Sequence, residues 1–140
     1  MSAALLEAGL RMTRQRKAVL DYLAPSAVHP SARQVFDEVS KAYPEISLAT
    51  VYNTLATLVR MDLVKVMEFD ALDNRYDTNL SPHINLICTS CGKIQDLKEG
   101  LPAQPARVKN ETGFEVLDYR MEYYGICEAC RSGTQKQREK

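Results

Sequence analysis

The chain has 140 residues and balances 18 basic against 18 acidic side chains, so its formal net charge is zero. Its mass of 15.8 kDa allows one modest domain or two small ones, and 45% hydrophobic with 26% charged residues is ordinary for a globular protein and excludes wholesale disorder. No apolar run approaches the roughly 18 residues of a membrane span, and the N-terminus lacks the pattern of a signal peptide. We therefore expect a cytoplasmic protein with no membrane partner.

The first half, up to about residue 70, is predicted to be mostly helical. Three helices are expected, each with a capping residue at its start: Thr13, Ser31 and Ser47. Ser31 and Gln34 have the spacing of a capping box, and Pro25 and Pro44 end the first two helices. Apolar residues recur at helical spacing after each cap, which predicts one buried face per helix.

A short hairpin is predicted to follow the third helix. Residues 63–69 are rich in β-branched and apolar residues and partly alternate. A turn-like stretch, 70–74, separates them from a partner strand at 75–78. Three helices followed by a small hairpin form the winged version of a helix-turn-helix.

The second half has a different pattern. Short apolar strands are expected at 84–88 and 94–97, on either side of a Cys-x-x-Cys turn. A helix is expected over about 103–111, and the alternation of 114–124 predicts one long strand.

The fold class is therefore predicted to be α+β, with two domains. Residues 1–74 would form the winged helix-turn-helix and residues 75–131 a small α/β domain, with the boundary expected within about 72–80. The charged, apolar-free tail, 132–140, is predicted to be disordered.

Four cysteines form two Cys-x-x-Cys pairs, Cys88 with Cys91 and Cys127 with Cys130. Two such turns complete the tetrahedral four-thiolate shell that Zn²⁺ accepts. A shell closed by four thiolates stabilises folding and catalyses nothing. The alternative is four buried or redox-active thiols, but a redox pair is expected near the start of a βαβ unit, where neither pair lies.

The chain has two histidines, His29 and His83, and each taken alone is more typical of a surface or core residue. Asp77 precedes His83, and Asp96 lies in the strand after the first cysteine turn. If these four side chains converge, two imidazoles and two carboxylates form a nitrogen and oxygen site that suits Fe²⁺ or Mn²⁺. The spacing alone does not establish that they converge.

Two features point to DNA. Four cations occur within seven residues, without an acid, at the start of the first helix: Arg11, Arg14, Arg16 and Lys17. The third helix carries a neutral, hydrogen-bonding face opposite its apolar stripe, made of Thr50, Asn53 and Thr57 and flanked by Ala49 and Tyr52. Such a face fits a major groove, although polar residues at this spacing more often form a solvated helix surface.

These segments resemble the ferric uptake regulator (Fur) family from about residue 5 to residue 130. The resemblance rests on several motifs in order: Gly9-Leu-Arg-Met-Thr-Arg-Gln-Arg16, His29-Pro-Ser-Ala32, Ile46-Ser-Leu-Ala-Thr-Val-Tyr-Asn-Thr-Leu55, Asn74-Arg-Tyr-Asp77, Cys88-x-x-Cys-Gly-Lys-Ile94 and Tyr124-Gly-Ile-Cys127. It implies a homodimeric, metal-dependent transcriptional repressor of a palindromic operator, with the second domain serving dimerisation.

The resemblance also implies residue roles. Tyr52, helped by Asn53 and Thr50, would contact bases, while Arg11 would enter the minor groove and Arg16 would hold phosphate, with Arg14 in the same arm. The four cysteines would bind structural zinc. A regulatory ion would bridge the two domains through His29, Asp77, His83 and Asp96, and so set the spacing of the reading helices in a dimer.

Asp77 and Asp96 stand where iron-sensing members commonly have glutamates, which resembles the peroxide-responsive PerR branch. There, bound Fe²⁺ reacts with peroxide, a ligand histidine is oxidised and DNA is released; here the sensitive residues would be His29 and His83. Mn²⁺ would support repression and react far less. Asn85 stands where the family usually has another histidine, so it is a further candidate ligand, weaker than imidazole.

Other functions remain open from the sequence. The chain could report iron or manganese availability, or less readily zinc availability, because the nitrogen and oxygen site has no thiolate. Asn85 also allows a degenerate sensing site with repression regardless of iron. A zinc hydrolase or deaminase would need an open zinc position and a nearby acid or base, which the closed cysteine set does not provide, so no enzyme is expected.

Overall fold

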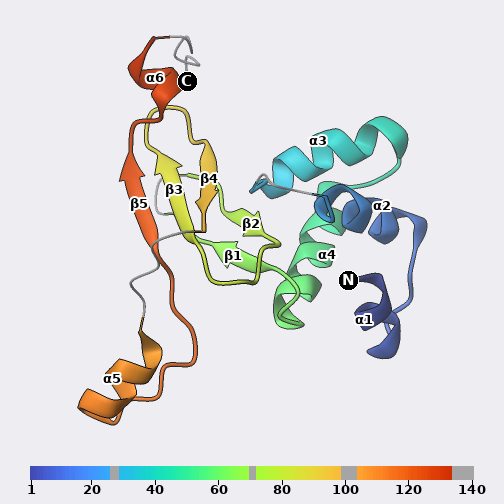
Figure 1. The fold of residues 1–140 in the computed structure, drawn as a ribbon. Coiled ribbons are helices and arrows are strands. Elements are labelled where there is room, and N and C mark those ends of the chain that lie inside the picture. The colour runs from blue at the N-terminus through green and yellow to red at the C-terminus, as the bar shows by residue number, and fades with distance from the viewer. Residues whose placement is uncertain (26–28, 70–71, 99–103, 134–140) are drawn as a thin grey trace. The chain divides into compact units, whose positions relative to one another are not determined.

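The computed structural model describes residues 1–25, 29–69, 72–98 and 104–133 (Figure 1). The chain divides into two compact units, Met1–Leu80 and Ser81–Lys140. The first unit contains α1 (Ser2–Glu7), α2 (Arg14–Leu23), α3 (Ala32–Ala42), α4 (Leu48–Arg60), β1 (Lys65–Met67) and β2 (Arg75–Asp77). No helix in the described ranges is long and apolar enough to cross a membrane.

The three predicted helices are confirmed together with their caps. The hydroxyls of Thr13, Ser31 and Ser47 each accept a hydrogen bond from the backbone N–H three residues on, at 3.1 Å. The Ser31 capping box is complete, because the Gln34 side chain accepts from the Ser31 backbone N–H at 2.8 Å. These local bonds satisfy amide groups that the first helical turn leaves without partners.

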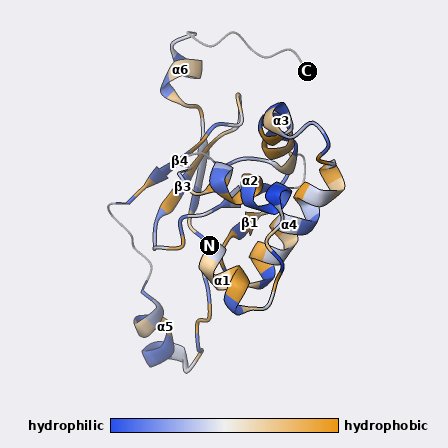
Figure 2. Cartoon of the chain, turned by 90° about the vertical axis from the view of Figure 1, so that its right-hand side faces the viewer, coloured by the Kyte–Doolittle hydropathy of each residue, from blue (hydrophilic) through white to orange (hydrophobic). Residues whose placement is uncertain are grey.

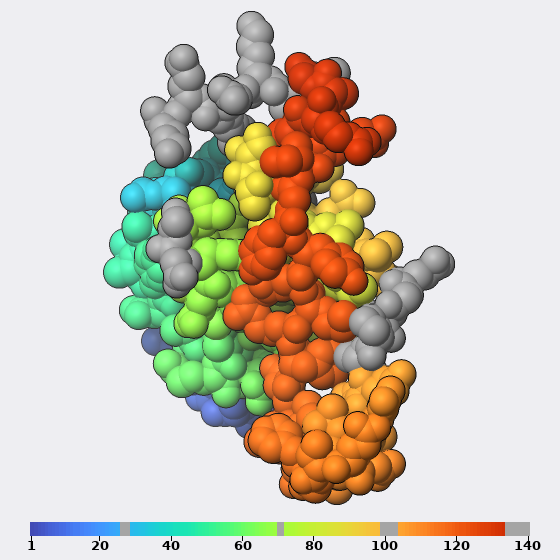
Figure 3. All heavy atoms as spheres, turned by 90° about the vertical axis from the view of Figure 1, so that its left-hand side faces the viewer, coloured from blue at the N-terminus to red at the C-terminus, as the bar shows by residue number. Residues whose placement is uncertain are grey.

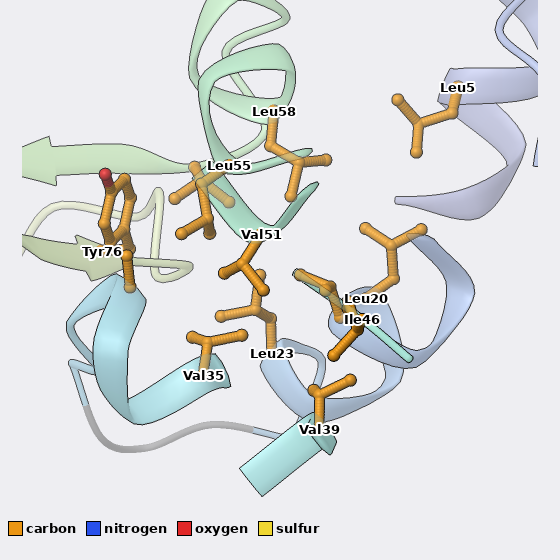
Figure 4. Packing of buried hydrophobic residues seen from close by; sticks show 13 residues of the cluster. Leu5, Leu20, Leu23, Val35, Val39, Ile46, Val51, Leu55, Leu58 and Tyr76 are labelled. Carbon is orange, nitrogen blue, oxygen red and sulfur yellow. The ribbon is translucent and has the colours of Figure 1, made fainter. Parts of the chain in front are cut away.

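The core of the first unit lies among α2, α3 and α4 (Figure 4). It is formed by apolar side chains that face inward from each helix, including Leu20, Leu23, Val35, Val51, Leu55 and Leu58. Leu5 adds a fully buried side chain from α1, a short helix that the sequence analysis did not predict. Hydrophilic and hydrophobic stretches lie side by side along these helices, as amphipathic packing requires (Figure 2).

The predicted hairpin is present but shorter than expected. β1 pairs antiparallel with β2, and Val66 lies opposite Tyr76. The first unit continues to Leu80, at the end of the range in which the boundary is expected, because β2 belongs to the same hairpin as β1. Residues 70–71 of the predicted turn lie outside the described residues.

The second unit is built on a three-stranded sheet in the order β4-β3-β5. Its elements are β3 (Ile84–Cys88), β4 (Ile94–Leu97), α5 (Pro105–Thr112), β5 (Glu122–Gly125) and α6 (Glu128–Arg131). β3 is central, antiparallel to β4 and parallel to β5. The strands at 84–88 and 94–97 match the prediction, and α6 was not predicted.

The prediction of a long strand over 114–124 is wrong: of the segment 114–125, only Glu122–Gly125 is a strand. β3 has five residues, and its pairing with β5 begins at Asn85 opposite Glu122. Residues 114–120 alternate in hydropathy but form no strand pairing among the described residues, and Leu117 is 90% exposed. Met121 accepts one backbone hydrogen bond from the Asn85 N–H at 2.9 Å. The alternation of hydropathy therefore indicates an extended segment but does not show that this segment pairs with another strand. Of the predicted tail, 134–140 lie outside the described residues.

Candidate metal centres and nucleic-acid interface

The four cysteines converge at one end of the sheet in the second unit. Cys88 ends β3, Cys91 lies in the following turn, and Cys127 and Cys130 lie at the start of α6 and within it. The strand register places Cys88 opposite Gly125, which brings the second pair to the first. All four Sγ atoms lie within 4.8 Å of one another, and those of Cys91 and Cys127 are 3.8 Å apart.

This arrangement fits a tetrahedral zinc ion. Four Zn–S bonds of about 2.3 Å place neighbouring sulfurs about 3.8 Å apart, which matches the Cys91–Cys127 distance. The separation also shows thiols rather than a disulfide. The cluster has no histidine or carboxylate member, so a zinc ion held there keeps no open position for a substrate.

The backbone of the cluster favours a thiolate at Cys88. The Cys127 N–H donates to the Cys88 Sγ at 3.3 Å, and this bond is the main reason why the pKa of Cys88 is lowered to about 6. Gly92 adopts a positive φ of 74°, and its N–H donates to the Cys88 carbonyl at 2.9 Å, which closes the tight turn between the first two ligands. The turn is thus shaped to present deprotonated sulfur.

The first unit contains one imidazole–carboxylate pair. His29 Nε2 lies 3.5 Å from Asp77 Oδ2, and both side chains are buried. The other oxygen of Asp77 accepts from the Asn79 N–H at 2.8 Å, which orients the carboxylate. An isolated β-bridge between Ser31 and Arg75 joins the His29 segment to β2, so residues far apart in sequence meet.

The second unit contains the other pair. His83 Nε2 lies 3.9 Å from Asp96 Oδ1. His83 Nδ1 lies 2.7 Å from the Ser81 carbonyl, which only accepts, so Nδ1 carries the proton and Nε2 keeps its lone pair for a metal.

Asn85 joins this pair through the sheet. It lies directly opposite Asp96 in the β3–β4 register, and cross-strand partners share a face. Asn85 is 9% exposed, and its Oδ1 is buried without a hydrogen-bond partner among the described residues. A buried acceptor without a donor is costly, and a metal ion would satisfy it.

Both pairs fit a small octahedral cation. Bonds of about 2.2 Å place two ligands of one ion between about 3.1 Å and about 4.4 Å apart, and the two distances in the structure, 3.5 and 3.9 Å, lie within that range. Each pair offers imidazole nitrogen and carboxylate oxygen without a thiolate. The structure brings His29 together with Asp77, and His83 with Asp96, one pair in each unit.

The face of α4 that was predicted to read DNA is present but differs in membership. Tyr52 is 51% exposed, and Asn53 is exposed beside it. Thr57 is buried and donates to the Asn53 carbonyl at 2.8 Å, so its place on this face was predicted wrongly. Thr50 hydrogen-bonds the Ser47 hydroxyl at the start of the helix and is half-buried.

Two exposed residues of α4 were missed. Ala56 and Arg60 continue the stripe of Tyr52 and Asn53 at helical spacing and are exposed. Thr57 can be buried beside this stripe because its hydroxyl donates to the backbone of the preceding helical turn and so needs no hydrogen bond to water. Its spacing, four residues from Tyr52 and three from Asn53, was the signal that could have found Ala56.

The basic arm is the segment that carries Arg11, Arg14, Arg16 and Lys17, and two of these four side chains make contacts within the first unit. Arg11 and Arg14 are exposed, whereas Arg16 is half-buried and donates from Nη1 to the Arg11 carbonyl. Lys17 pairs with Asp21 at 2.6 Å. Arg11 and Arg14 therefore present the free charge of this segment, and Arg16 orders the backbone that carries Arg11.

Comparison with known proteins identifies the family of the chain. The model of the ferric uptake regulator family matches residues 7–124. A peroxide-responsive repressor, PerR, of Staphylococcus aureus is 38% identical over 130 residues, which cover 92% of this chain and 88% of that protein.

Solved structures are similar as well. The Campylobacter jejuni peroxide stress regulator is 32% identical, with a TM-score of 0.72, over 92% of this chain and 95% of that one. A zinc-bound manganese uptake regulator is 27% identical, with a TM-score of 0.68, over 90% and 97%. Matching over most of its length, the chain belongs to the ferric uptake regulator family, whose members regulate transcription rather than catalyse a metabolic reaction.

Proposed function

We propose that this regulator is a DNA-binding transcriptional repressor that requires a regulatory metal ion and is switched off by peroxide. The observation that carries the proposal is the pair of imidazole–carboxylate sets, His29 with Asp77 and His83 with Asp96, one in each unit. An ion that takes ligands from both sets fixes one unit against the other. Metal binding is thereby coupled to DNA affinity, because only one arrangement of the units presents α4 correctly.

The zinc ion has a separate role. All four of its ligands, Cys88, Cys91, Cys127 and Cys130, lie in the second unit. The ion therefore stabilises that unit and does not respond to the regulatory metal. Fe²⁺ or Mn²⁺ occupies the nitrogen and oxygen ligands, with Asn85 Oδ1 as an additional donor.

Peroxide sensing would follow from Fe²⁺ held by His29 and His83, because a bound Fe²⁺ would activate peroxide toward a ligand imidazole. In the net reaction one imidazole C–H bond of His29 or His83 becomes a C–O bond, and water is released. The imidazole loses two electrons and peroxide gains them. An oxidised imidazole is a poorer ligand, so the ion is lost and the operator is released. Mn²⁺ supports repression without this reaction. The similarity to peroxide-responsive repressors supports this finer assignment.

The DNA contacts are assigned to the exposed stripe of α4 and the basic arm. Tyr52 and Asn53 face the bases, and Arg11 and Arg14 hold the backbone, helped by the order that Arg16 gives to the arm. The chain has zero net charge, so affinity depends on these local cations and on base contacts rather than on a global field. The relatives that support this proposal are transcriptional regulators, and we expect this protein to act in the cytoplasm as well.

A homodimer on a palindromic operator completes the proposal. The second unit exposes apolar side chains along β5 and the segments on either side of it, including Phe114, Leu117, Tyr123 and Ile126. This segment lies at the surface (Figure 3), and α5 has no buried residue. A second copy of the chain would cover these residues and pair two α4 helices with two half-sites.

The test uses a duplex selected from a random-sequence library with the Mn²⁺-loaded protein. Binding is measured by fluorescence anisotropy with zinc-loaded protein that carries no regulatory metal, Mn²⁺ or Fe²⁺, the Fe²⁺ form before and after peroxide under anaerobic conditions. Affinity should require Mn²⁺ or Fe²⁺, and peroxide should abolish it only in the Fe²⁺ form. Peptide mass spectrometry should locate one added oxygen on His29 or His83. Metal-independent binding would contradict the proposal.

The second candidate is a sensor of iron or manganese availability in the same family. Asn85 favours it, because an amide oxygen in place of imidazole makes the ligand set harder and suits Mn²⁺. This function predicts that both metals support DNA binding and that peroxide leaves both histidines unmodified.

A further inference from the structure

Arg75 makes an unusual contact with the candidate ligand His29. Its Nη1 donates to the backbone carbonyl oxygen of His29 at 2.6 Å, across 46 positions of sequence. Arg75 begins β2, and Asp77, the partner of His29, ends it. One strand thus carries both a carboxylate that faces the His29 ring and a guanidinium that holds the His29 backbone.

The same guanidinium nitrogen also reaches the capping box of α3. Arg75 Nη1 lies 3.3 Å from Gln34 Oε1, which also accepts from the Ser31 N–H at 2.8 Å. Arg75 therefore connects three pieces of backbone: the His29 segment, the first turn of α3 and β2. Burial lowers the pKa of Arg75, against the charge of Asp73, yet the guanidinium stays protonated and can donate at any physiological pH.

Neighbouring residues also restrict the backbone conformation of His29. Pro30 follows it and confines His29 to extended conformations. The Pro30 carbonyl accepts from the Tyr76 N–H at 2.9 Å. Together with the Arg75 bond, these contacts fix both the backbone of His29 and the direction in which its imidazole leaves the chain.

We propose that Arg75 is a positioning residue for the regulatory metal: its bond to the His29 carbonyl holds the imidazole Nε2 beside the Asp77 carboxylate before any ion arrives. This inference rests on the proposed function. Preorganisation of this kind reduces the ordering cost of binding. Arg75 acts through geometry and not through charge, because a cation near a metal site opposes a second cation.

The test compares Mn²⁺ binding to zinc-loaded, full-length wild type, Arg75→Met and Arg75→Lys, by electron paramagnetic resonance of free Mn²⁺. Loss of an outer partner of a metal ligand typically weakens binding about 10- to 100-fold, and we expect this for Arg75→Met. Arg75→Lys keeps one donor and should recover part of the affinity. Arg33→Met is the matched control: Arg33 is exposed in the first turn of α3, lies over Phe36, and should be neutral.

Two further measurements separate positioning from damage to the fold. Zinc-loaded, Mn²⁺-free Arg75→Met should keep the circular-dichroism spectrum and the cooperative unfolding of wild type, whereas structural damage would remove them. At saturating Mn²⁺, Arg75→Met should bind the selected duplex as tightly as wild type, with only the Mn²⁺ dependence shifted. If Arg75→Met does not fold, Arg75→Lys and Gln34→Ala carry the test, with smaller expected losses.

The outcomes also distinguish this inference from the proposed function. If His29→Ala leaves Mn²⁺ affinity unchanged, the proposed regulatory site fails. If His29→Ala abolishes Mn²⁺ binding and Arg75→Met and Arg75→Lys both bind as wild type does, the site holds and the role of Arg75 is overturned.

Discussion

The two kinds of metal ligand in this chain are arranged in opposite ways. The four thiols lie in one unit, within 4.8 Å of one another. The histidines and aspartates form two pairs, one in each unit. A site whose ligands all come from one folded unit is completed by folding, whereas ligands divided between two units are completed only when the units adopt one arrangement. The first design suits a permanent ion and the second a switch.

The largest effect is expected at the cysteine cluster. Cys127→Ser removes one of four zinc ligands, and structural zinc binding is worth about 10–16 kcal/mol in small domains. The variant should lose its zinc, measured by metal analysis, and the second unit should unfold at a lower temperature or not fold. Glu128→Gln, at the next position and the first residue of α6, is the control and should keep both zinc and stability. A Cys127→Ser protein with full zinc content would place the ion elsewhere.

A smaller effect, confined to the regulatory metal, is expected at Asp77. Asp77→Asn keeps the size of the side chain and an acceptor for the Asn79 N–H, but removes a negative charge from the ion. Mn²⁺ affinity should fall at least about tenfold, while zinc content and the unfolding temperature stay near those of wild type. Asp37→Asn, an exposed carboxylate on α3, should change none of these. Loss of zinc from Asp77→Asn would show that the two metal sites are not independent.

Replacement of Tyr52 should weaken DNA binding without touching either metal. Tyr52→Ala removes the largest exposed side chain of the α4 stripe, and contacts to bases are each worth about 1–3 kcal/mol. Anisotropy at saturating Mn²⁺ should therefore show about 5- to 150-fold weaker binding. Lys41→Ala, at the end of α3 and paired with Glu38, serves as the control. Equal affinity of Tyr52→Ala and wild type would place the reading surface on another element.

The smallest effect is a gain of affinity at Asn85. Asn85→His replaces a buried amide oxygen by imidazole on the same face as Asp96. Borderline ions such as Zn²⁺ and Co²⁺ should bind more tightly, by about tenfold, and Mn²⁺ less so. Gln95→His adds a histidine on the opposite face of the sheet and should have no effect. If the two variants titrate alike, Asn85 is not a ligand.

The features that the sequence predicted best are those that depend on residues close together in the chain. The caps at Thr13, Ser31 and Ser47 are local hydrogen bonds, so their residue types specify where α2, α3 and α4 begin. The wrong predictions concern features that depend on contacts between residues far apart in the chain. Alternation over 114–124 did not reveal that residues 114–120 form no strand pairing with β3, and α1 is too short to show a period.

The candidate metal sites show the same difference between local and long-range features. Cysteine spacing reports a tetrahedral shell directly, because each Cys-x-x-Cys turn already holds two ligands. The meeting of His29 with Asp77 depends on the Ser31–Arg75 bridge and on the Arg75 side chain, which no periodic pattern encodes. The burial of Thr57 was also not predictable from its polar character, because its hydroxyl bonds to the backbone of its own helix and can therefore be buried.

The central claim is that one ion takes ligands from both units, and the stoichiometry of Mn²⁺ binding tests it most directly. Zinc-loaded wild type, His29→Ala and His83→Ala are titrated with Mn²⁺ under identical conditions. The account predicts one high-affinity Mn²⁺ per wild-type chain and the loss of that same ion in either variant. Two independent ions per chain, or a His83→Ala protein that keeps wild-type affinity through His29 and Asp77, would contradict it.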